Sequence, residues 1–336
     1  MKSLLLSLFT LALIMACSED SNPTDDDNNN NNNDPGHDTV KFGTWEWLDS
    51  WNDNSFFGVH LIDYNNAWAV GNGGTIIFTT DGGTSWDNRH SGWSYDFRDV
   101  FFADSQYGWV VGEKSKILVT TNGGDSWVVG SFISHTLITI NKVFANNAGN
   151  LWVGGTDGII AYSTDTGITW TKQHEKANTS IYDITFSSPS IGYAVGSSGL
   201  LLKTTNGGSV WNEIDLGTGS GLNSVSFPTE DIGYVVGDLN KFYKTTNAGK
   251  DWEDMEYTGL TVDLVNCVSF VTKYTGWISG LDKLMAITTD GGKTWASQDI
   301  PVSDPNFYFL DMVFLDSEHG FASGSDGNIF RYNITE

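Results

Sequence analysis

Short apolar segments recur throughout residues 41–336, and glycine, asparagine or aspartate separates each from the next. β-Branched and aromatic residues dominate these segments, as they do in strands, and the intervening residues are typical of tight turns. No stretch places its apolar residues at helical spacing. The pattern predicts an all-β domain.

Two sequence units repeat along this domain. One is GWVVG at 108–112, which is present with variation in seven copies, and the other is TTNGGDSW at 120–127, which is present in six. Successive tryptophans of the second unit lie 41, 43, 41, 41 and 43 residues apart. Four predicted strands fit in each period, which is typical of a β-propeller blade. We therefore predict a seven-bladed β-propeller with four-stranded antiparallel blades.

The seventh repeat is short, because the chain ends at Glu336 before a second unit can follow. The missing part is present at the other end, where Gly43, Thr44 and Trp45 match the end of that unit. We expect residues 41–48 to supply the outer strand of the last blade. The propeller is then closed by the N-terminal strand, with no open sheet edge at the junction.

Residues 1–16 are predicted to be a signal peptide, since Lys2 precedes an apolar run that is too short to span a bilayer. The run ends in Ile-Met-Ala followed by Cys17, which resembles the lipobox of bacterial lipoproteins. That resemblance implies lipidation of Cys17 after cleavage. An ordinary signal peptide that ends near a cysteine is the alternative.

Residues 17–40 are acidic and asparagine-rich, so we expect a disordered tether. The acidic residues 18–20 resemble the surface-export signal of Bacteroidetes-type lipoproteins, with a plain tether as the alternative. The protein is then expected to be lipid-anchored to the outer membrane, on the cell surface or on the periplasmic side.

The charge of the domain limits the classes of partner. Residues 41–336 contain 34 acidic residues and 16 lysines and arginines, a net charge of −18. Such a surface repels nucleic acid and anionic membranes, so we expect a protein or glycan partner and a monomeric chain. The histidines lack metal-ligand spacing and no phosphate-binding glycine loop is present, so no metal or cofactor is expected. Cys267 lies in an apolar run and is predicted to be a buried core residue.

The second unit, S/T-x-D/N-x-G-x-x-W, resembles the Asp-box, or BNR repeat, of sialidases and related propellers. Its Asp or Asn can accept hydrogen bonds within the turn, its Gly permits a positive φ, and its Trp packs between strands. Half of the Asp positions are Asn, which is neither a base nor a nucleophile, so a structural role is predicted. The box residues are Asp81, Gly83, Trp86, Asn122, Gly124, Trp127, Asp165, Gly167, Trp170, Asn206, Gly208, Trp211, Asn247, Gly249, Trp252, Asp290, Gly292 and Trp295.

The two units together resemble the photosystem II assembly and stability factors of cyanobacteria and chloroplasts, and the bacterial lipoproteins that share their repeat. The resemblance covers roughly residues 55–335. It implies the propeller fold, whereas function does not carry over with a fold. Those factors use an arginine-rich patch, whereas this chain has only Arg89, Arg98 and Arg331, in different repeats. A literal role in photosystem assembly is therefore not expected.

The alternative function is an extracellular glycoside hydrolase of sialidase or xyloglucanase type. A sialidase needs clustered arginines, and the xyloglucanase type resembles two propellers around a cleft, whereas one propeller is predicted here. Two carboxylates about 5 to 9 Å apart on the central face would support a hydrolase. The favoured hypothesis is a non-catalytic, membrane-anchored extracytoplasmic binding or assembly propeller.

A partner is expected to bind the face that carries the turns between second and third strands and the segments between blades. Two of these segments are rich in aromatic residues. The candidate partner-binding residues are Trp93, Tyr95, Arg98, Phe307 and Tyr308, because exposed aromatic groups commonly anchor ligands. Alternatively, aromatic residues that begin a first strand point into the core, as expected for Phe97 and Phe309.

Overall fold

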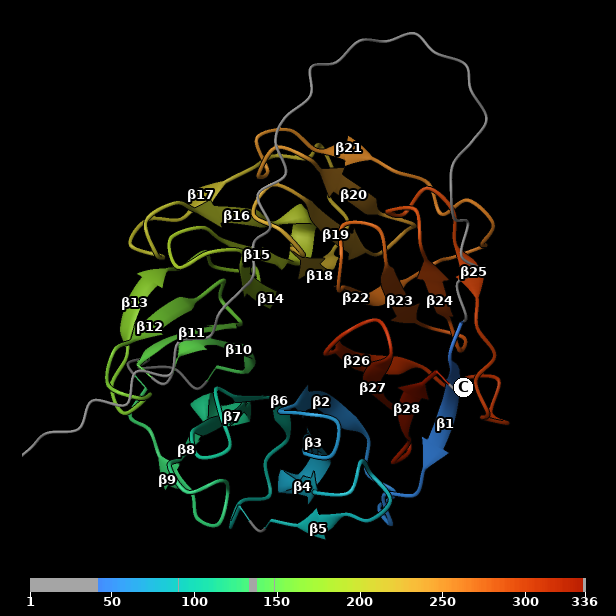
Figure 1. Ribbon diagram of the computed structural model, residues 1–336. Coiled ribbons are helices and arrows are strands. Elements are labelled where there is room, and N and C mark those ends of the chain that lie inside the picture. Colours follow the sequence, from blue (N-terminus) through green and yellow to red (C-terminus); the bar gives the residue numbers. More distant parts are fainter. Residues whose placement is uncertain (1–41, 90, 133–137, 148, 335–336) are drawn as a thin grey trace, which may run out of the picture. The chain divides into compact units, whose positions relative to one another are not determined.

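The computed structural model describes residues 42–89, 91–132, 138–147 and 149–334. Within them the strands form seven separate four-stranded antiparallel sheets, arranged as a ring around a central axis (Figure 1). The predicted all-β, seven-bladed propeller is confirmed. The predicted signal peptide, Cys17 and the tether lie outside the described residues. No helix in the described ranges has the length and apolar character that a bilayer span requires.

In blades 1 to 6 the four strands follow sequence order from the axis to the rim, whereas in blade 7 the outermost strand is the N-terminal one. The strands are β2 (Phe56–Leu61), β3 (Ala67–Gly71), β4 (Ile76–Thr79) and β5 (Asp87–Asn88) in blade 1; β6 (Phe97–Phe102), β7 (Gly108–Gly112), β8 (Ile117–Thr120) and β9 (Val128–Val129) in blade 2; β10 (Ile140–Asn147), β11 (Asn150–Gly155), β12 (Ile160–Ser163) and β13 (Thr171–His174) in blade 3; β14 (Ile181–Phe186), β15 (Gly192–Gly196), β16 (Leu201–Thr204) and β17 (Asn212–Glu213) in blade 4; β18 (Leu222–Ser226), β19 (Gly233–Gly237), β20 (Phe242–Thr245) and β21 (Glu253–Asp254) in blade 5; β22 (Val265–Phe270), β23 (Gly276–Gly280), β24 (Met285–Thr288) and β25 (Ala296–Ser297) in blade 6; and β26 (Phe309–Phe314), β27 (His319–Gly324), β28 (Ile329–Asn333) and β1 (Thr44–Leu48) in blade 7. Three of the turns are single-turn 3-10 helices, η1 (Asn72–Gly74), η2 (Glu113–Ser115) and η3 (Ser197–Gly199).

The outermost strands are short. In the six blades that carry a box, this strand begins one residue after the box tryptophan, as β5 does after Trp86. In five blades this strand has only two residues, because the tryptophan is still part of the turn. Short outer strands leave few unpaired backbone groups at the rim, which limits edge-to-edge association between molecules.

The N-terminal strand completes the last blade, as predicted. β1 pairs antiparallel with β28, and Trp45 lies opposite Tyr332. The Gly43 N–H also donates a hydrogen bond to the Tyr332 hydroxyl at 2.6 Å. Two segments from opposite ends of the chain therefore form one sheet, which closes the ring (Figure 1).

The first repeated unit fixes the packing between blades. In five blades its aromatic residue stacks on a phenylalanine at the end of the next blade's first strand, as Tyr234 does on Phe270, with ring centroids 3.6 Å apart. In blade 6, a Cβ at Gly276 would lie 2.5 Å from that phenylalanine ring. At the end of the unit, a Cβ on Gly280 would lie 2.3 Å from the carbonyl oxygen of Leu264. Both glycines are required because neighbouring atoms occupy the space of a side chain.

Candidate functional site

The six box turns share one set of hydrogen bonds. In the first, the Thr79 hydroxyl donates to Asp81 Oδ1 at 2.8 Å and accepts the Gly83 N–H at 2.9 Å. Asp81 Oδ1 also accepts the Ser85 N–H at 2.9 Å. Asn206, in the fourth box, accepts the equivalent Val210 N–H at 2.9 Å. Because the amide oxygen bonds in the same way as the carboxylate, these positions stabilise turns and perform no chemistry.

The structure separates two faces of the ring. The box turns contact the turns between first and second strands, as the Gly291 N–H does in donating to Tyr274 O at 2.9 Å. We call this the box face. The turns between second and third strands contact the segments between blades, as the Glu113 N–H does in donating to Asp96 O at 3.0 Å. We call this second surface the connection face.

The connection face differs from blade to blade although the scaffold repeats. Its turns all need two consecutive left-handed residues, which are Gly73 and Gly74 in blade 1 but Leu239 and Asn240 in blade 5. The segments between blades range from residues 175–180, after β13, to residues 298–308, after β25. Loops of variable length and composition on a rigid scaffold are where binding specificity usually resides.

Trp93 and Tyr95 form an aromatic cluster on the connection face. Their rings are stacked with centroids 6.0 Å apart, and Lys116 Nζ lies 3.8 Å from the centroid of the Trp93 ring. Trp93 is 37% exposed and also lines a hollow of about 420 Å³ beside η1. An exposed indole held in place by a neighbouring ring and a cation is preorganised for contact with a partner. The role of Trp93 in partner binding stays a prediction.

Arg98 also lies on this face, but its guanidinium is already occupied. It is 3.3 Å from Glu113 Oε1 and 3.6 Å from Asp96 Oδ2, and it lies 4.2 Å from the centre of the Phe57 ring. The other two arginines pair elsewhere, Arg89 with Asp125 and Arg331 with Glu46. The three arginines therefore do not form a common site for a substrate carboxylate.

The aromatic pair before β26 is divided between surface and core. Tyr308 is 36% exposed, whereas Phe307 is 1% exposed and packs against Phe309 and Phe330. The expectation that Phe307 contributes to the contact surface is therefore corrected. Alternation along an extended chain places residues 307 and 309 on one side and residue 308 on the other. That alternation, extended one step before the strand, could have identified Phe307 as buried.

Sequence reasoning missed a ring of side chains in the central channel. Every first strand carries a bulge, and the residue after the bulge occupies the equivalent position of the first strand in all seven blades. We call these residues the axial ring; they are Gly58, Asp99, Lys142, Asp183, Ser224, Cys267 and Asp311. Alignment of the repeats at this position would have revealed three acids and one lysine that are far apart in sequence.

The axial carboxylates link neighbouring blades. Asp99 Oδ2 accepts the Val143 N–H of the next blade at 2.8 Å. Asp183 and Asp311 accept the corresponding N–H groups, from Val225 at 2.9 Å and from Val59 at 2.9 Å. The carboxylates thus replace backbone hydrogen bonds that separate sheets cannot make to each other.

Lys142 is the cation of this ring, with Nζ 3.5 Å from Asp99 Oδ1 and 3.8 Å from Asp183 Oδ1. Burial raises the pKa of the Asp99 carboxyl to about 7, with Lys142 opposing the shift and Asp311 adding to it. Burial raises the pKa of Asp183 as well. Burial alone would lower the pKa of Lys142, but the neighbouring carboxylates raise it well above its usual value. Lys142 offsets one of the three carboxylate charges, and backbone N–H groups also stabilise the carboxylates, as expected of a structural network.

This arrangement does not suit the hydrolase alternative. A glycosidase needs one carboxylate as acid and another facing water or the sugar, whereas each axial carboxylate is bonded to backbone N–H groups. Cys267 lies in the same ring, is buried as predicted, and its pKa is raised by burial, which disfavours a reactive thiolate. Within the described residues no group of three or more acidic, histidine or cysteine side chains could hold a metal ion.

Comparison with known proteins agrees with the repeat pattern. The profile of the family described as photosynthesis system II assembly factor YCF48 matches residues 38–128, 92–176, 129–205, 172–260 and 259–333. No curated protein matches the chain.

Similar solved structures include YCF48 bound to D1 peptide, at 23% identity and a TM-score of 0.71, covering 88% of this chain and 99% of that one. YCF48 from Cyanidioschyzon merolae matches at 20% identity and a TM-score of 0.73, covering 86% and 99%. The WD40 β-propeller domain of Doa1 matches at 13% identity and a TM-score of 0.70, covering 88% and 98%. At these identities the structures support the fold alone.

Proposed function

The chain belongs to the family described as photosynthesis system II assembly factor YCF48, and on that premise we propose that it is a non-catalytic propeller that binds a protein partner through its connection face. A relative in this family has been solved with a bound peptide, which supports a protein ligand in preference to a small substrate. The D1 peptide is the ligand of that protein. For this chain we propose only the class of the partner, which is a protein.

The observation that carries the proposal is the contrast between the two faces. All six box turns have the same hydrogen bonds, whereas the connection face varies from blade to blade. Both faces expose some apolar side chains, but the exposed indoles of Trp51 and Trp93 lie on the connection face. A fold needs identical turns to close its blades, but it does not need a solvent-exposed tryptophan. Exposed apolar groups rimmed by polar residues typically mark protein interaction sites.

The net charge of the domain defines the partner further. With 34 acidic residues against 16 basic ones over residues 41–336, the surface favours a basic or neutral protein. The axial carboxylates do not change this, because backbone N–H groups and Lys142 already engage them. A glycan ligand would be an alternative outcome of the binding experiment below.

We also propose that the propeller acts outside the cytoplasm, held at the outer membrane by a lipid on Cys17. The support is the pattern of a short apolar run followed by Ala16 and Cys17, and then an acidic tether. Metabolic labelling with a fatty acid analogue tests this directly. Label should enter the wild-type chain and not Cys17→Ser, and equal labelling of the two would contradict the anchor.

The binding function is tested by affinity capture from the native cell envelope with the full chain as bait. Trp93→Ser combined with Tyr95→Ser should remove the captured partner. Tyr274→Ser is the matched control, because Tyr274 is 55% exposed and lies on the box face. The proposal would be contradicted if the Trp93 and Tyr95 variant captured the same proteins as wild type, or if the Tyr274 variant alone lost them.

A further inference from the structure

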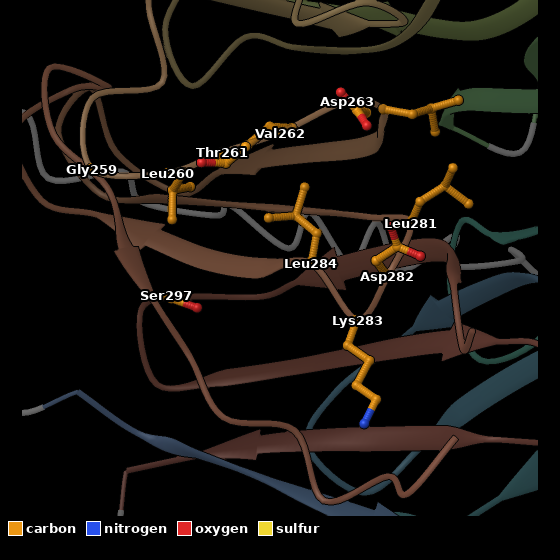
Figure 2. Close-up of a pocket in the computed structure, with 11 residues that line it drawn as sticks. Gly259, Leu260, Thr261, Val262, Asp263, Leu281, Asp282, Lys283, Leu284 and Ser297 are labelled. Carbon is orange, nitrogen blue, oxygen red and sulfur yellow. The ribbon is translucent and has the colours of Figure 1, made fainter. Parts of the chain in front are cut away.

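The connection face also carries a groove between blades 5 and 6, away from Trp93 and Tyr95. Two hollows, of about 410 and 690 Å³, lie on either side of the segment 260–262 and share it as a wall. Figure 2 shows the first hollow, into which Leu284 and Leu281 project from the turn after β23. We call the two hollows together the blade 5–6 groove. Their volumes are in the range of ligand-binding sites.

The floor of the groove is apolar. The first hollow is lined by Leu260, Val262, Leu281 and Leu284, and the second by Leu260, Val262, Met255 and Tyr257. Val262 and Tyr257 are buried in the core, Met255, Leu260 and Leu284 are half-buried, and Leu281 is exposed. Covering the exposed parts of these side chains with another apolar group is favourable.

Leu239, at the edge of the groove, makes an unfavourable contribution to the stability of the fold. It is 75% exposed and has a φ of 54°, in the left-handed region that disfavours a leucine by about 1 to 2 kcal/mol. The equivalent position is Gly73 in blade 1 and Ser198 in blade 4, so the turn has no need of an apolar side chain. A strained and exposed leucine at a groove edge indicates a contact with something outside the chain.

The rim of the groove is acidic. Asp263, Asp282 and Glu256 line the hollows, and their carboxylates have no hydrogen bond or ion pair with any described residue. The two lysines of the lining are both engaged. Lys241 pairs with Asp254 at 3.3 Å, and Lys283 points away from Asp263 (Figure 2) to donate to Val302 O at 2.8 Å. The lining therefore holds four carboxylates, those of Asp254, Glu256, Asp263 and Asp282, against the ammonium groups of Lys241 and Lys283, and it is acidic on balance.

From these observations we propose that the blade 5–6 groove binds a peptide segment of the partner protein that carries large aliphatic side chains flanked by lysine or arginine. The aliphatic groups cover the apolar floor and Leu239, and the cations pair with Asp263, Asp282 and Glu256. This inference rests on the proposed function, because it assigns a site and a ligand chemistry to the same connection face.

The test uses four synthetic peptides of equal length and the full chain in detergent, with binding measured by fluorescence anisotropy. Each peptide contains either leucine or serine together with either lysine or glutamate, which gives the four combinations. The leucine–lysine peptide should bind saturably, and each of the other three should bind about tenfold more weakly or less. Equal binding of all four peptides, or no saturable binding of the leucine–lysine peptide, would overturn the proposal.

Two variants localise that binding. Leu239→Gly should weaken the leucine–lysine peptide about fivefold while the melting temperature stays the same or rises, because glycine relieves the strained φ. Asp263→Asn combined with Asp282→Asn should weaken it about tenfold. Asp157→Asn is the matched control, since Asp157 occupies in blade 3 the turn position of Asp282, and it should leave binding unchanged. Unchanged binding by both groove variants would overturn the assignment.

Two further results separate this inference from the proposed function. If the groove variants bind all peptides as wild type does while Trp93→Ser still loses the captured partner, the groove assignment fails and the binding function stands. If sedimentation shows a dimer that Leu239→Gly dissociates, the occupant is a second copy of this chain, and the proposal of a basic peptide is wrong.

Discussion

Trp45 lies opposite Tyr332 in the β1–β28 pair, with ring centroids 5.3 Å apart and an interplanar angle of 56°. The indole Nε1–H also donates to Gln298 Oε1 at 3.0 Å, on the far side of the junction with blade 6. Trp45 is therefore the side chain through which the N-terminal strand is held in a blade built from the C-terminal end.

Trp45→Ala should destabilise the propeller by about 3 to 5 kcal/mol, because it opens a cavity at the closure of the ring. Thermal or denaturant unfolding measures the change. Trp47→Ala is the control, since Trp47 is on the same strand but exposed, and it should cost about 1 kcal/mol or less. Equal losses for the two variants would show that Trp45 has no special role in closure.

Thr204→Val should destabilise the fold by about 1 to 3 kcal/mol, because the Gly208 N–H then loses its buried acceptor. Asn206→Asp should change stability by less than about 0.5 kcal/mol, because three other boxes already use Asp at this position. Urea unfolding of both variants tests the structural role of the box. A large loss of stability for Asn206→Asp with none for Thr204→Val would contradict it.

Lys142→Met should destabilise the protein by about 3 kcal/mol at pH 8, because Asp99, Asp183 and Asp311 then have no cation among them. Burial raises the pKa of Asp99 to about 7 and also raises that of Asp183, so Asp99 becomes protonated as the pH falls below 7. The difference in unfolding free energy between variant and wild type should therefore shrink at pH 5.

Lys172→Met is the control for that measurement, because Lys172 forms an exposed pair with Glu175. It should cost about 0.5 kcal/mol or less at both pH values. If Lys142→Met were equally destabilising at pH 5 and pH 8, the buried carboxylates would not be the source of its effect.

Burial lowers the pKa of His60 from 6.5 to about 4, against the opposing effect of its hydrogen bond to Phe102 O at 2.9 Å. The folded pKa is below the unfolded one, so the unfolded chain binds more protons between these values. The contribution of His60 to stability is complete above pH 6.5 and is lost as the pH falls toward 4. An NMR titration should place its midpoint below 5, and a midpoint near 6.5 would contradict the burial of its neutral form.

The repeats were sufficient to predict the blades, because each turn and each packing glycine is local and occurs in every copy. The closure of the ring by the strand of Trp45 could also be predicted, because the last repeat is incomplete at the C-terminus and its missing part is present at the N-terminus. The axial ring was harder to predict from the sequence. Its charged residues Asp99, Lys142, Asp183 and Asp311 come together only through a bulge in each first strand, which sequence patterns do not mark. Phe307 was misassigned because composition does not tell which side of an extended segment a ring occupies.

The blade 5–6 groove could not be predicted for a different reason. Its walls come from a segment between blades, 259–264, which has no counterpart in the repeat and follows no local periodicity. Leu239 looked like an ordinary turn residue until its φ and exposure were known. Features that depart from the repeat are therefore both the least predictable and the ones on which the proposed binding depends.

Site-specific photocrosslinking in the native envelope tests the connection face most directly. A photoreactive phenylalanine analogue would replace Trp93, Leu239 or Tyr274 in turn in the full chain. One and the same protein should be crosslinked from positions 93 and 239, and none from position 274 on the box face. Crosslinking from position 274 alone, or from none of the three, would contradict a propeller that binds its partner through the connection face.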